Sequence, residues 1–128
     1  MSKNIKEWFH QADYDMRSAQ LMFDNRRYIH AVFFCHLSIE KALKGLLAKT
    51  SDDVPPKTHN LIFLIEKSGL TLPVDMFDFM FLLNGVSVPT RYPDELKRMQ
   101  KDYSKAKAGS LLEQGQKALK WLKAKSKE

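Results

Sequence analysis

The stretch AVFFCHLSIEKALKGLLA, residues 31–48, decides the fold. Apolar side chains recur in it at intervals of three and four residues, which places them on one face of an α-helix that starts near Tyr28 and ends near Lys49. Other apolar residues widen this stripe: Phe33, Phe34, Leu37 and Leu47. A helix that is apolar on more than one side must be covered on more than one side. We therefore expect it at the centre of a bundle, covered by neighbouring helices or by a second subunit.

A second long amphipathic helix precedes this one. From Ile5 to Phe23, apolar residues recur at helical spacing with charged residues between them. A polar break at Asn25, Arg26 and Arg27 separates the two helices. Because the connection is short, the two helices must pack antiparallel.

The chain after the central helix contains clear start and stop signals. The segment from Thr50 to Lys57 has the composition of a loop, and Thr58 is placed to cap a short third helix that ends near Gly69. Pro73 favours the first turn of a fourth helix, which the Asn84-Gly85 pair ends.

An extended loop and a last helix complete the predicted order. Residues 86–93 indicate the loop, a polar region follows, and Ser104 is placed to cap the last helix. No stretch alternates as a strand would. The sequence therefore predicts an all-α, up-and-down bundle of four to five helices, and residues 1–128 are expected to form a single domain.

Composition excludes several classes of protein. The 44% hydrophobic and 28% charged residues are typical of a folded globular chain. The longest apolar stretches, such as residues 76–83, are too short to span a bilayer, and Lys3, Lys6 and Glu7 stand where a signal peptide would be apolar. We expect a cytoplasmic protein without a membrane segment. The single cysteine, Cys35, excludes an internal disulfide and indicates a buried, unreactive thiol.

The net charge of +6 is concentrated near the C-terminus. Residues 97–128 contain ten Lys or Arg against three acids, whereas residues 1–96 contain eleven against twelve. A basic face attracts nucleic-acid phosphates, but Lys-rich terminal helices are also common as solvated surfaces. Both interpretations remain open.

No common catalytic fingerprint or metal-ligand spacing is present, so the candidates are small groups of residues. His36, Glu40 and Lys44 share one helical face, which suits either proton transfer or a packed histidine beside a Glu–Lys pair. His59 follows the predicted cap Thr58 at a helix N-terminus, where it could bind an anion or complete the cap. Arg91 and Tyr92 lie between Pro89 and Pro93 and could hold a phosphate and a base, or a carboxylate and a helix.

The pieces together resemble a known family. Residues 31–48 resemble the second helix of HEPN domains, whose pattern is an aromatic and small-residue run followed by Glu-Lys-Ala-Leu-Lys. The resemblance continues in KTHNLIFLIEKSG (residues 57–69), in PTRYPDE (residues 89–95) and in the opening helix with Trp8, Ala12 and Asp15. It covers nearly the whole chain.

The resemblance implies a helical homodimer of the prokaryotic type, encoded beside a minimal nucleotidyltransferase and acting with it as a toxin–antitoxin module. Positions that this subgroup tends to keep, and that bind a nucleotide or a partner, correspond to Glu40, Lys41, His59, Arg91 and Tyr92. Neither a cofactor nor a metal is implied.

Many HEPN domains are also metal-independent endoribonucleases, whose active site joins two Arg-x4-6-His motifs across a dimer. Here no histidine follows Arg91, and His30 follows Arg26 and Arg27 too closely. The expectation is therefore a non-catalytic protein that binds a nucleotide, RNA or a nucleotidyltransferase. Two alternatives remain: a ribonuclease that uses Arg91 with His36 or His59, and a purely structural homodimeric module.

Overall fold

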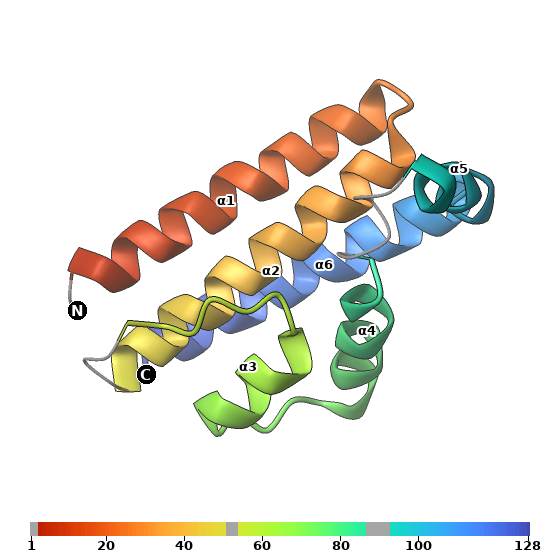
Figure 1. Cartoon of the computed structure of the whole chain (residues 1–128). Coiled ribbons are helices and arrows are strands. Elements are labelled where there is room, and N and C mark those ends of the chain that lie inside the picture. The colour runs from red at the N-terminus through yellow and green to blue at the C-terminus, as the bar shows by residue number, and fades with distance from the viewer. Residues whose placement is uncertain (1–2, 51–53, 87–92) are drawn as a thin grey trace.

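Three long helices form the framework of the protein in the computed structural model, which describes residues 3–50, 54–86 and 93–128 (Figure 1). They are α1 (Lys3–Asp24), α2 (Tyr28–Thr50) and α6 (Lys105–Ser126). Three shorter helices lie between α2 and α6 in the sequence: α3 (Leu61–Ser68), α4 (Val74–Asn84) and α5 (Pro93–Asp102). The described residues form no strand, and none of their helices is long and apolar enough to cross a membrane. The all-α prediction is confirmed.

The chain runs up and down the bundle, as predicted. It turns sharply after α1, descends through α2, returns through α3, α4 and α5, and descends again through α6 (Figure 1). Consequently α6 is parallel to α2, and the two helices end together. Lys49, near the end of α2, donates hydrogen bonds to the backbone carbonyls of Lys125 and Glu128.

Helix α2 is the centre of the bundle. It packs against α1, α6 and α3, with smaller contacts to α4 and α5. Leu47 is buried by these neighbours, whereas Phe33, Phe34 and Leu37 are only partly covered. Neighbouring helices therefore supply most of the cover that the sequence requires for α2.

Small side chains allow the helices to approach α2 closely. Ser38 donates a hydrogen bond to the carbonyl of Ala12 at 2.7 Å, which ties α2 to α1 inside the core. On the other side, a Cβ atom at Gly115 of α6 would lie 2.2 Å from Cys35 Sγ. Burial raises the pKa of the Cys35 thiol to about 12. Cys35 is therefore a buried, protonated packing residue, as predicted.

Two local predictions are wrong. Asn60, not Thr58, caps α3: its side chain accepts the backbone N–H of Phe63, while Thr58 accepts the N–H of Asn60. Both residue types can cap a helix, so the sequence did not decide between neighbouring positions. The other predicted boundaries at Gly69, Pro73 and Ser104 are confirmed.

The second wrong prediction concerns α5, because the sequence predicts only a polar region for these residues. It raises the number of helices in the described residues to six, beyond the predicted four to five. Met99 is its buried anchor. With so few apolar positions, its sequence carries little helical periodicity. Most of the predicted loop over residues 86–93 lies outside the described residues.

Candidate functional site

A buried carboxylate in the middle of α2 organises the candidate site. The side chain of Glu40 is only 5% exposed, and its Oε2 atom accepts a hydrogen bond from Lys44 Nζ at 3.0 Å. The two residues are one helical turn apart, as the sequence predicted. An unpaired carboxylate at this depth would be strongly unfavourable, so the pair allows the charge to be buried.

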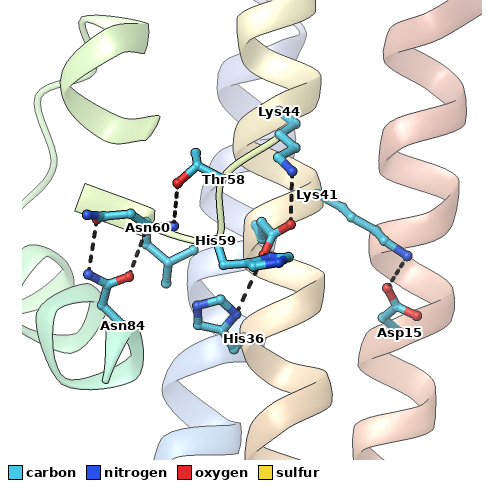
Figure 2. A network of polar contacts seen from close by, with 10 residues as sticks. Asp15, His36, Lys41, Lys44, Thr58, His59, Asn60 and Asn84 are labelled. Atoms are coloured by element: carbon cyan, nitrogen blue, oxygen red, sulfur yellow. Dashed lines mark hydrogen bonds and ion pairs between the residues drawn. The ribbon is translucent and has the colours of Figure 1, made fainter. Parts of the chain in front are cut away.

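His59 reaches Glu40 from the loop before α3 (Figure 2). Its Nδ1 atom donates to Glu40 Oε1 at 2.9 Å, while its side chain remains 51% exposed. A carboxylate bonded to one ring nitrogen fixes the tautomer of the neutral imidazole. His59 therefore carries its proton on Nδ1 when neutral, which leaves Nε2 as an acceptor.

The loop that carries His59 is held by paired amides (Figure 2). Asn84, the last residue of α4, donates through Nδ2 to Asn60 Oδ1 at 3.1 Å. Its own Oδ1 accepts the backbone N–H of Leu61 at 2.8 Å. The end of α4 thus fixes the start of α3. Because His59 directly precedes Asn60, it is held over α2. The sequence predicts Asn84 only as the end of a helix, because its hydrogen-bond partners are distant in the sequence.

His36 lies beneath this pair, one turn before Glu40. It is 1% exposed, its Nδ1 is 3.8 Å from Glu40 Oε1, and neither ring nitrogen has a hydrogen-bond partner in the described part of the chain. Burial lowers the pKa of His36 to about 4, although the charge of Glu40 opposes the shift. His36 is therefore a neutral packed residue near pH 7.

Lys41 points to the opposite side of α2. Its Nζ atom lies 2.7 Å from Asp15 Oδ2 of α1, and Figure 2 shows this pair directed away from His59. Of the five predicted site residues, the structure brings Glu40 and His59 together and places Lys41 in a separate ion pair. Arg91 and Tyr92 lie outside the described residues.

The arrangement supports hydrogen bonding and proton transfer rather than metal binding. No group of three His, Cys, Asp or Glu side chains in the described ranges could hold a metal ion. An exposed imidazole oriented by a buried carboxylate can accept or donate a proton at Nε2. It can equally hydrogen-bond a ligand or a partner protein.

Comparisons with known proteins agree with this architecture. A family model described as "HEPN domain" matches residues 5–125. Among solved structures, TT1696 from Thermus thermophilus is 26% identical, with a TM-score of 0.82 over 97% of this chain and 99% of that one. ST0689, an archaeal HEPN homologue, is 24% identical, with a TM-score of 0.76 over 98% of this chain and 99% of its own.

The similarity to ST0689 supports the fold alone, and no curated protein matches the sequence. The family model, however, spans nearly the whole chain, from the start of α1 to the end of α6. The three-helix framework and the loop with His59 both lie inside the matched range. The chain therefore belongs to the HEPN family.

Proposed function

We propose that this HEPN protein is non-catalytic, that it forms a homodimer, and that it binds a nucleotide, a minimal nucleotidyltransferase partner or both in a toxin–antitoxin-like module. The observation that carries the proposal is an exposed apolar surface on α4, which the described residues of one copy of the chain leave uncovered. We call it the α4 face and define it by four residues: Val74, Phe77, Phe81 and Leu82.

Helix α4 is apolar on both sides. Phe79, Met80 and Leu83 are buried against the bundle, while Phe81 and Leu82 remain 68% and 64% exposed. Large apolar surfaces in water favour association, and monomeric proteins seldom leave them open. A second copy of the chain would bring an identical face, as a two-fold interface requires.

The α4 face predicts a specific change of mass. Phe81→Glu with Leu82→Glu should convert a dimer into a monomer that stays folded, because both side chains already face solvent. Light scattering measures the mass, and circular dichroism checks the fold. The matched control is Tyr14→Glu with Leu21→Glu on α1, whose side chains are 61% and 62% exposed. A monomeric wild type would contradict the proposed dimer, and equal disruption by the control would contradict the α4 face as its interface.

Glu40 and His59 support the ligand-binding part of the proposal. His59 presents Nε2 to solvent from a fixed loop, and the family resemblance adds Arg91 and Tyr92 to this binding set. It also adds Lys41, which lies on the opposite side of α2 as a separate position. Thermal shift with ATP, GTP and AMP tests it, because a ligand that binds only the folded state raises the melting temperature. His59→Ala should reduce the shift, whereas His10→Ala on the exposed surface of α1 should leave it unchanged. A dimer that no nucleotide stabilises would instead favour the purely structural module.

The metal-independent ribonuclease is the second candidate. The 2.9 Å contact between Glu40 and His59 favours it, because an oriented imidazole is a suitable general base. Arg91 would then be the residue that stabilises the phosphate. Pure protein in EDTA should cleave RNA with a pH dependence that His59→Ala abolishes. Intact RNA at every pH would eliminate this candidate and leave the non-catalytic one.

A further inference from the structure

A second polar site lies at the N-terminal end of α2. A pocket of about 200 Å³ opens between the α1–α2 turn and the end of α5. Its polar lining comes from two segments that are distant in sequence: Arg26, Arg27, Tyr28 and His30 on one side, Gln100 and Tyr103 on the other. None of the residues that line it is acidic. Residues 29 and 40 are eleven positions apart on one helix, so about 16 Å separates this pocket from Glu40.

The turn that carries the two arginines has a fixed geometry. The backbone N–H of Arg27 donates to the carbonyl of Met22 at 2.8 Å, and that of Arg26 donates to Phe23 at 3.0 Å. These two bonds form a Schellman motif, which ends α1. Arg26 occupies its left-handed position with a φ of 65°, where glycine is usual. The pocket wall therefore keeps its shape without a ligand.

No described side chain neutralises the cations of this wall. In the part of the chain that the structure describes, the side chains of Arg26, Arg27 and His30 make no hydrogen bond or ion pair. The neighbouring carboxylate of Asp24 accepts a hydrogen bond from Gln20 at 2.9 Å instead. Two arginines thus line the pocket, and neither guanidinium group has a partner among the described residues. Guanidinium groups bind phosphate through paired N–H donors, which a single lysine cannot supply.

The opposite wall adds an aromatic hydroxyl and further positive charge. Burial raises the pKa of Tyr103, and the charge of Asp102 adds to the effect, so its phenol stays protonated and can donate a hydrogen bond. Lys107 Nζ lies 4.8 Å from the centre of the Tyr103 ring. A lysine of the basic C-terminal segment therefore lies against Tyr103, which lines the same pocket as the two arginines.

We propose that this pocket binds a phosphate monoester, with Arg26 and Arg27 as the principal donors and Tyr103 as a further one. The volume is below the roughly 300–1,000 Å³ of sites that enclose drug-sized ligands. The pocket therefore admits a terminal phosphate and its sugar rather than a whole dinucleotide. Such a group occurs in a free mononucleotide and at the 5′ end of an RNA.

Fluorescence and calorimetric titrations of the full chain test the proposal with four probes: AMP, adenosine, a 5′-phosphorylated RNA octamer and the same octamer with a 5′-hydroxyl. AMP or the phosphorylated RNA should bind at least tenfold more tightly than its counterpart without the phosphate. If AMP carries the difference, the ligand is a mononucleotide. If only the RNA pair does, it is an RNA end.

The test variant is Arg26→Gln with Arg27→Gln, and the matched control is Lys6→Gln with Arg17→Gln. Each removes two positive charges from exposed positions, so net charge is equal in the two variants. The test variant should lose at least tenfold in affinity for the phosphorylated probe, and the control less than twofold. Equal losses in the two variants, or equal binding of the phosphorylated and hydroxyl probes, would show that only general charge attraction binds the probe. Either result would overturn the proposal.

This inference deepens the nucleotide-binding part of the proposed function and rests on it for the ligand class. The two fail separately. His59→Ala reports on the site at Glu40, whereas the arginine variant reports on the pocket at the α1–α2 turn. Affinity that His59→Ala removes and the arginine variant keeps would support the proposed function and refute the pocket.

Discussion

Two polar regions, one in the middle of α2 and one at its N-terminal end, differ in whether their charged side chains are paired within the chain. In the middle of α2, Glu40 and Lys44 are nearly inaccessible to water, and their side chains lie 3.0 Å apart. At its N-terminal end, Arg26 and Arg27 are exposed and have no ion-pair partner among the described residues. The first region pairs its charges within the chain, and the second does not pair its own with any described residue.

The difference follows from the cost of removing a charge from water. A buried ion must be paired, because its lost hydration is worth several kcal/mol. An exposed cation keeps its hydration and needs no partner. Stability therefore depends on the pair at Glu40, whereas the arginines contribute little to stability and remain available to a ligand. His59 lies between these extremes, since one ring nitrogen is bound inside and the other faces solvent.

Breaking the buried pair should have the largest effect. Glu40→Gln is expected to lower the free energy of unfolding by about 3 kcal/mol, because it leaves the Lys44 charge buried without a counter-charge. Urea denaturation at pH 7 measures the change. Glu113→Gln is the matched control, since its ion pair with Lys117 is exposed and spans 3.7 Å. It should produce no measurable loss.

A double substitution separates charge from packing. Glu40→Gln with Lys44→Met removes both buried charges and should recover most of the stability that Glu40→Gln alone loses. If the double variant is no more stable than the single one, the hydrogen bond from His59 rather than the ion pair holds this region together.

The buried histidine predicts a pH dependence. Its pKa is about 4 in the folded protein against 6.5 for an unperturbed histidine, so the unfolded chain binds the extra proton first as pH falls. The contribution of neutral His36 is complete above pH 6.5 and is lost between pH 6.5 and 4. The full loss is about 3 kcal/mol, because one pKa unit corresponds to about 1.4 kcal/mol.

His36→Leu should remove that part of the pH dependence. The measurement is the free energy of unfolding at intervals from pH 7.5 to 4, compared between the variant and wild type. The remaining slope belongs to the other titrating groups of the chain. His10→Gln, at an exposed position, should leave the wild-type curve unchanged. Parallel curves for wild type and His36→Leu would contradict the buried neutral state.

The smallest expected effect lies at the open end of α2. Arg26→Gly should raise the free energy of unfolding by about 0.5 kcal/mol, because glycine adopts the left-handed conformation without steric cost. Arg27→Gly, at the next position, should lower it. Affinity for the phosphorylated probe should fall in both variants. Stabilisation with unchanged affinity would show that Arg26 is not a ligand of the pocket.

The sequence was informative where the signal is local. The bounds of α2, the break at residues 25–27 and the caps at Gly69 and Ser104 all follow from short-range patterns, and the structure confirms them. The contact of Glu40 with Lys44 was also predictable, because residues four apart on a helix face the same side. Helix α5 was missed because it has few apolar residues to reveal its period.

The sequence by itself determined five of the six helices in the described residues, the central place of α2 and the pairing of Glu40 with Lys44, since helical geometry fixes which neighbours meet. Only the tertiary structure decided that His59 bonds to Glu40, that Asn84 holds the start of α3, and that Tyr103 faces Arg26 and Arg27. Each of these contacts joins residues from different elements. Their proximity results from how the helices pack, and spacing along the chain does not encode it.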